Sequence, residues 1–223
     1  MKKTTYLLLF SCLIFFQSCF EIVEQVFLKK DGSGSLQFVI NLSKSKTKLN
    51  AIMKMKTVNG HDVPSKEEIK QKVTAIEKTI SKTVGISNIK TTLDFDNYIA
   101  TISCNFNKVS QLNAAIKSIS DKENSKIKNI EKMYAYDAGA NTFIRLNKLS
   151  LKEDYNKMSN ADKEIFATAN YTTIYKFESS IAAKSNKDAN ISPSKKGLML
   201  KQNILDLLTN KKSIENIINL NKQ

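Results

Sequence analysis

CFEIVEQVFLKKDGSGSLQFVINL, residues 19–42, places a cysteine directly before two β-rich runs and a glycine-containing turn. The runs at residues 22–29 and 35–42 predict a β-hairpin, because Gly32 and Gly34 supply the positive φ angles that a tight reversal needs. One side of the second run carries its large apolar residues, which are Leu36, Phe38, Ile40 and Leu42. The hairpin is therefore expected to have one covered face and one partly wet face.

The segment before this cysteine has the order of an export signal. Lys2 and Lys3 form a positive start, and residues 6–16 form an apolar core of about eleven residues. A membrane-spanning helix needs roughly 20 apolar residues, so this core is too short to span a bilayer. Residues 1–18 are therefore predicted to be a lipoprotein signal peptide.

Cys19 is the predicted lipid attachment point. Both Cys12 and Cys19 follow a serine, the kind of small residue that a bacterial lipoprotein signal peptidase accepts. Cleavage before Cys12 would leave an apolar core of only about six residues, which is too short for a signal. The stretch FFQSC resembles a lipobox, with Phe16 where leucine is usual. The alternative is an ordinary secreted protein cleaved near Ser18, with Cys19 free.

Lipidation makes the membrane the first predicted partner. Each buried methylene of an acyl chain such as palmitate contributes about 0.8 kcal/mol, so a cysteine with two or three chains holds firmly. Cys19 is followed neither by an aspartate nor by an acidic run. We therefore expect the bacterial cell envelope as the location, on the outer membrane and facing the periplasm rather than the cell surface.

The net charge of +14 raises the question of a nucleic-acid partner. Among the 35 basic residues only Arg145 is an arginine, the residue suited to bidentate phosphate and base contacts. The lysines are scattered along the whole chain. We therefore predict no nucleic-acid partner and interpret the lysines as solvated faces, with attraction to anionic lipid headgroups as the alternative.

Residues 19–223 are predicted to form a single α+β envelope domain, an antiparallel β-sheet of hairpins with helices packed mainly on one face. The clearest helix spans residues 66–84 and begins at a capping box formed by Ser65 and Glu68. Its apolar stripe is expected to pack against the sheet. A helical insertion is predicted near residues 150–170. The other predicted elements are hairpins over 88–106 and 133–146, a helix from about 110, strands at 171–177 and 198–201, and an apolar tail at 204–220.

The sequence offers no converging set of catalytic groups. The single histidine, His61, has no second histidine or thiol nearby in the sequence to complete a zinc site. Asp94 and Asp96 bracket a turn without the pattern of a calcium loop, and Cys104 is predicted to be a buried structural thiol. We therefore predict a non-enzymatic protein without catalytic, metal-binding or cofactor-binding residues, and without a cofactor.

Four tyrosines on predicted strands have two interpretations. They are Tyr134, Tyr136, Tyr171 and Tyr175. Core aromatics are the default interpretation, and the lining of a sugar or lipid cavity is the alternative.

Two parts of the chain resemble the LppM-type lipoprotein domain. They are the hairpin EIVEQVFLKKDGSGSLQFVINLS and the end segment TTIYKFESSIAAKSNKDANIS with GLMLKQNILDLL after it. Phe177 is followed by Glu178, whereas members of that family often have proline there. The resemblance implies an α+β domain at the cell envelope that handles lipid or glycolipid, and it transfers no catalytic residues.

Two functions remain open. The first is a lipid-anchored lipoprotein that binds a lipid, a glycolipid or a protein partner between its sheet and helices. The second is a scaffold or adaptor subunit of an envelope complex without a small-molecule site. An apolar cavity of several hundred Å³ under the helices would favour the first. A packed interior with an exposed apolar patch on residues 150–170 would favour the second.

Replacing Cys19 by alanine is expected to release the protein from the membrane, because the acyl chains would attach through this thiol. Partitioning of the expressed protein between detergent and aqueous phases measures the release. Cys12→Ala is the matched control, since Cys12 also follows a serine but is not the predicted attachment point. Unchanged partitioning of Cys19→Ala would contradict lipidation at this residue.

Overall fold

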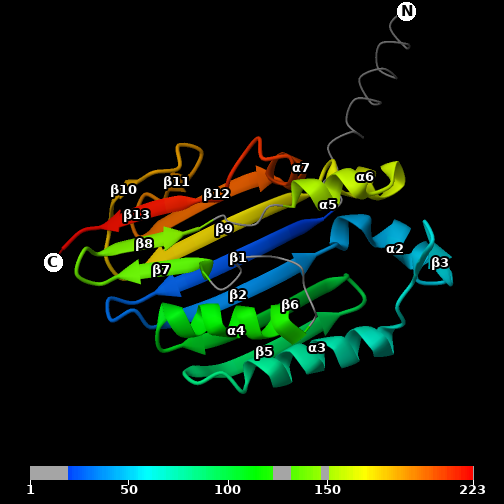
Figure 1. Cartoon of the computed structure of the whole chain (residues 1–223), viewed down its shortest axis with the longest axis horizontal. Coiled ribbons are helices and arrows are strands. Elements are labelled where there is room, and N and C mark those ends of the chain that lie inside the picture. The colour runs from blue at the N-terminus through cyan, green and yellow to red at the C-terminus, as the bar shows by residue number, and fades with distance from the viewer. Residues whose placement is uncertain (1–19, 123–131, 147–150, 223) are drawn as a thin grey trace, which may run out of the picture.

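The computed structural model describes residues 20–122, 132–146 and 151–222 (Figure 1). The predicted signal peptide and Cys19 lie outside these ranges, as does most of the charged segment between residues 121 and 131. Within the described part, no helix has both the length and the apolar character needed to cross a membrane.

A seven-stranded sheet forms one layer of the molecule, with the strand order β11-β12-β9-β1-β2-β6-β5. Its strands in chain order are β1 (Glu21–Leu28), β2 (Gly34–Asn41), β5 (Ile86–Asp94), β6 (Ile99–Phe106), β9 (Asn170–Phe177), β11 (Asn190–Ile191) and β12 (Gly197–Asn203). The predicted hairpins β1–β2 and β5–β6 are confirmed, and they pair with each other through β2 and β6.

A four-stranded sheet with the order β10-β13-β8-β7 lies over part of the large one. Its strands are β7 (Tyr134–Asp137), β8 (Thr142–Arg145), β10 (Ile181–Lys184) and β13 (Asn216–Leu220). A short ribbon pairs β3 (Thr57–Val58) with β4 (His61–Asp62). The predicted third hairpin is thus confirmed as β7–β8, but it belongs to a second sheet, and the apolar tail supplies a strand of that sheet.

The helices are mostly short. They are the 3-10 turn η1 (Ser43–Ser45), α2 (Lys46–Ile52), α3 (Lys66–Ile80), α4 (Val109–Lys122), α5 (Lys152–Lys157), α6 (Asn160–Phe166) and α7 (Ile204–Leu208). The helical segment predicted near residues 150–170 is present as α5 and α6. The chain therefore has the predicted α+β class, with one departure from antiparallel pairing, because β1 and β9 run parallel.

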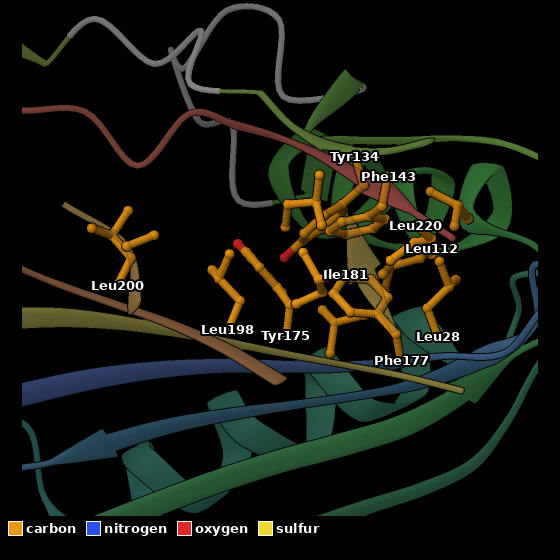
Figure 2. Close-up of a cluster of buried hydrophobic side chains, with 14 of the residues drawn as sticks. Leu28, Leu112, Tyr134, Phe143, Tyr175, Phe177, Ile181, Leu198, Leu200 and Leu220 are labelled. Carbon is orange, nitrogen blue, oxygen red and sulfur yellow. The ribbon is translucent and has the colours of Figure 1, made fainter. Parts of the chain in front are cut away.

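The small sheet and the helices α3 and α4 cover the same face of the large sheet (Figure 1). In β1 every second side chain points into this layer, so Glu24, Val26 and Leu28 are buried. Figure 2 shows Phe143 of the small sheet against Tyr175 and Phe177 of β9, with ring centroids 5.3 and 5.7 Å away. The hydrophobic core therefore lies between the two sheets.

The opposite face of the large sheet is only partly covered, as predicted. Gln37, Asn105 and Lys176 are exposed on it, and Met199 is 46% exposed. An antiparallel sheet tolerates such a wet face because its strands alternate between polar and apolar side chains.

The β1–β2 turn uses its two glycines for different reasons. Gly32 has a φ of +81°, and the Asp31 carboxylate accepts hydrogen bonds from the amide and hydroxyl of Ser33 at 2.9 and 2.7 Å. Gly34 does not have a positive φ, so the prediction for this residue was wrong. A Cβ atom there would lie 2.0 Å from the Phe27 carbonyl oxygen and 2.7 Å from the Phe106 ring. Gly34 is required by close packing.

Helix α3 begins as predicted and ends early. The Ser65 side chain accepts from the Glu68 amide at 3.2 Å, and the Glu68 carboxylate accepts from the Ser65 amide at 2.7 Å. The helix stops at Ile80, four residues before the predicted end. Val84 is 83% exposed because it lies in the turn between α3 and β5, where Gly85 has a φ of +80°.

Gly34→Ala is expected to lower the free energy of unfolding by about 2 to 3 kcal/mol, because the added methyl group meets backbone and a buried ring. Urea unfolding measures the change. Gly139→Ala is the control, since a Cβ atom there meets only the Asp137 side chain, at 3.3 Å, and should change stability by less than about 1 kcal/mol. Equal stability of the two variants would contradict the packing argument.

Candidate functional site

An apolar cavity of about 340 Å³ lies between the large sheet and the helices α3 and α4. Its floor is formed by side chains of β2 and β6: Leu36, Phe38, Ile40, Ala100, Ile102 and Cys104. Its roof is formed by Val73, Ile76 and Ile80 of α3 and by Leu112, Ile116 and Ile119 of α4. The site is thus a hydrocarbon-lined space beneath two helices.

The cavity exists because α3 stands away from the sheet. The apolar stripe of this helix faces the sheet as predicted, but of its residues only Ile80 is buried. The helix is held at its edges instead. Thr91 of β5 donates to the Glu77 carboxylate at 2.8 Å, and the Lys122 ammonium donates to the Thr79 hydroxyl at 3.1 Å. The prediction that this stripe packs directly on the sheet was therefore wrong, because the stripe faces the sheet across the cavity.

A buried ion pair lies at one side of the cavity. Arg145 donates from Nε to Glu24 Oε1 at 2.9 Å and from Nη2 to Glu24 Oε2 at 2.8 Å, and both residues are 1% exposed. The hydroxyl groups of Tyr175 and Tyr171 donate to the same two oxygens at 2.7 and 2.5 Å. The carboxylate therefore accepts four hydrogen bonds from side chains on β8 and β9.

The remaining guanidinium nitrogen is also satisfied. Nη1 of Arg145 donates to the carbonyl oxygens of Leu146 and Met133 at 2.5 and 3.5 Å. The Tyr134 ring lies 4.9 Å from the guanidinium carbon. Because the lone pairs of the carboxylate and the donors of the guanidinium are already engaged, the pair acts as a structural element.

Electrostatics keep this network in one protonation state. Burial alone would raise the pKa of Glu24, but the charge and hydrogen bonds of Arg145 lower it below the ordinary value of 4.5. Burial raises the pKa of Tyr171 and of Tyr175 well above 10, and the negative charge of Glu24 adds to this shift. At neutral pH the tyrosines therefore stay neutral donors to an ionised carboxylate.

His61 lies at the surface beside Asp162. Its Nε2 is 3.4 Å from Oδ2 of Asp162, and its side chain is 73% exposed. Ser159 donates to the same carboxylate at 2.7 Å and accepts from the Asp162 amide at 3.1 Å, as the N-cap of α6. Asp162 therefore lies between the histidine and the serine, which is not the order in which a base activates a nucleophile.

The other residues considered from the sequence occupy ordinary structural positions. Cys104 is buried in the cavity wall, and burial raises the pKa of its thiol. The Asp94 carboxylate accepts from the amides of Asp96 and Asn97 at 3.0 and 2.9 Å, which shapes the β5–β6 turn. Over the part of the chain that the structure describes, no three metal-ligating side chains gather.

The four tyrosines that were predicted either to lie in the core or to line a cavity do not all have the same position. Tyr134 and Tyr171 line the cavity, and Tyr175 lies in the core between the sheets. Tyr136 donates to the Lys30 carbonyl oxygen at 3.1 Å, at the tip of the β1–β2 hairpin.

Glu24 is not among the residues predicted from the sequence. Two features of the sequence nevertheless point to its buried ion pair with Arg145. Glu24 falls on the same side of its strand as Val26 and Leu28, so it interrupts an apolar side with a charge, and Arg145 is the single arginine of a lysine-rich chain. A buried carboxylate needs a partner, and arginine is the basic residue best suited to a buried ion pair.

Comparison with solved structures gives a distant similarity. No protein-family model matches the chain, and no curated protein sequence matches it. The NMR structure of the folded domain of the LppM protein from Mycobacterium tuberculosis is similar to it. The TM-score is 0.46 and the sequence identity 10%, over 92% of this chain and 91% of that chain. The resemblance to LppM is thereby confirmed as a distant structural similarity.

Arg145→Met is expected to lower the free energy of unfolding by about 3 to 5 kcal/mol, because it leaves a buried carboxylate without its cation. Glu24→Gln/Arg145→Met should recover a large part of this loss, since no buried charge remains. Urea unfolding measures both variants.

Lys117→Met is the control for the Arg145 variant. It removes an exposed partner, 2.6 Å from Asp121, and should change stability by about 1 kcal/mol or less. If Arg145→Met proved no more costly than this control, the pair would not have the structural role assigned to it.

Proposed function

We propose that the chain is a lipid-anchored, non-enzymatic lipoprotein of the bacterial cell envelope that holds the hydrocarbon part of a lipid or glycolipid. The observation that carries this proposal is the apolar cavity beneath α3 and α4. Its volume of about 340 Å³ falls within the range of small-molecule sites. A well-packed domain of this size would be expected to close such a space.

The lining of the cavity determines the chemistry of the ligand. Its walls are aliphatic and aromatic, and the polar groups at its side are Glu24 and the tyrosines that already bond to it. A polar ligand inside would lose its hydrogen bonds to water without gaining others. An acyl or alkyl chain loses none, so the hydrocarbon enters and the head group remains outside.

The start of the folded part agrees with a short tether. The Phe20 ring packs edge to face on Phe166 at 6.2 Å, and β1 begins at Glu21. If Cys19 carries the acyl chains, only Phe20 separates the anchor from the first strand. We place the protein on the periplasmic face of the outer membrane, because neither an aspartate nor an acidic run follows Cys19.

The adaptor function has less support, because it was expected to use an exposed apolar patch on residues 150–170. Tyr155 of α5 and Phe166 of α6 pack against each other, with ring centroids 6.5 Å apart, and Phe166 also packs against Phe20. Ile165 is 41% exposed, but single exposed apolar residues are normal on protein surfaces. The described part of α5 and α6 therefore turns its aromatic side chains inward.

Val73→Trp is expected to reduce bound lipid about tenfold or more, because the indole would project from α3 into the cavity. Native mass spectrometry of the purified protein, together with analysis of its organic extract, measures the bound lipid. Gln71→Trp is the matched control, since it places the same side chain at an exposed position of the same helix.

Two results would count against lipid binding. One is wild-type protein that carries no lipid and takes none up from envelope lipid extract. The other is a folded Val73→Trp variant that carries as much lipid as Gln71→Trp.

A further inference from the structure

A second apolar cavity, of about 350 Å³, lies beside the first, under α2 and the β3–β4 ribbon. Its walls include Leu49 and Ile52 of α2, Met53 directly after it, Val63 after the ribbon, and Phe95 after β5. The apolar side chains of α2 therefore also face a space rather than a packed core.

The two cavities share a floor. Ile40, Leu93 and Ala100 line both of them. These residues are neighbours across three adjacent strands, because Ala100 of β6 pairs with Ile40 of β2 on one side and with Leu93 of β5 on the other. Ile40 remains 37% exposed although it lies on the covered face of the sheet. The row of these three residues therefore lies between the two cavities.

Helix α3 runs along both cavities. Ile69, in its first turn, lines the second cavity, whereas Val73, Ile76 and Ile80 line the first. From Ile69 to Ile80 the helix advances about 16 Å. Together the two cavities therefore extend along this length of α3, which suits an extended chain better than a compact molecule.

The two ends of this space differ. The inner end is apolar, with Leu36 and Cys104 on its floor, and Glu24 lies to one side of it with a fully hydrogen-bonded carboxylate. The outer end has charges of both signs, because the ammonium groups of Lys66 and Lys70 lie 5.3 and 5.8 Å from the Phe95 ring centre, and Asp62 and Asp94 line the same cavity. A head group is therefore accommodated at the outer end, without selection by one sign of charge.

We infer that the two cavities form one channel for a single unbranched acyl chain, with the head group at the ribbon and the methyl end near Leu36 and Cys104. This inference rests on the proposed lipid binding and adds a preference for long chains. A short chain occupies only the outer cavity. A long chain passes the row of Ile40, Ala100 and Leu93 and buries further methylenes in the inner cavity.

Binding of monooctanoin, monolaurin and monopalmitin to the purified protein tests this preference, because these monoacylglycerols differ only in chain length. We expect the affinity, measured by native mass spectrometry at matched ligand concentrations below micelle formation, to rise about tenfold or more from the shortest to the longest chain. Ala100→Phe should abolish this gain, because its ring would block the passage between the two cavities.

Val39→Phe is the matched control, since Val39 precedes Ile40 on β2, its side chain points to the opposite face of the sheet, and it lines neither cavity. It should retain the chain-length dependence. If Ala100→Phe does not fold, Ile40→Trp closes the same passage from β2 and is measured in the same way.

The outcomes separate the two proposals. Binding that is independent of chain length, or a gain that persists in a folded Ala100→Phe or Ile40→Trp variant, overturns the channel and leaves lipid binding in place. Failure of the wild-type protein to bind any of the three, together with the absence of co-purified lipid, overturns lipid binding itself.

Discussion

The buried pair of Glu24 and Arg145 determines how the two sheets of this protein are placed. Both charges are removed from water, so each must meet its partner in the geometry that satisfies every donor and acceptor. Glu24 belongs to β1 of the large sheet and Arg145 to β8 of the small sheet, and their nitrogens and oxygens meet at 2.9 and 2.8 Å. The small sheet therefore cannot slide over the large one without leaving a buried charge unpaired.

The position of the small sheet in turn determines the space under the helices. Asn113 of α4 donates to the Tyr134 carbonyl oxygen at 2.7 Å and accepts from the Tyr134 amide at 3.1 Å, so α4 is fixed to β7. Helix α3 packs against α4 and β5, and Thr91 of β5 donates to its Glu77 carboxylate at 2.8 Å. These contacts hold both helices along their edges. The apolar stripe of α3 therefore stays apart from the sheet, and the cavity lies between them.

Local features of the fold were predictable from the sequence, and its long-range features were not. The β1–β2 and β5–β6 hairpins and the capping box at Ser65 depend on residues close together in the chain. The parallel pairing of β1 with β9 joins Glu21 to Asn170, and a period of two specifies a strand's buried side but not its neighbour. The cavity could not be predicted from the sequence. The apolar residues of α3, such as Val73, recur at the same helical spacing whether the helix packs directly on the sheet or faces a cavity.

The register of β1 places the predicted anchor at Cys19 and the proposed channel at the same end of the sheet. Glu21 pairs with Asn41, so the start of β1 lies at the end of the sheet where β2 leads into α2 and the ribbon, as Figure 1 shows. Ile22 pairs with Ile40, which belongs to the shared floor of the two cavities. If acyl chains on Cys19 hold this end at the bilayer, the outer cavity lies beside the membrane, and a lipid chain could enter it without crossing an open layer of water.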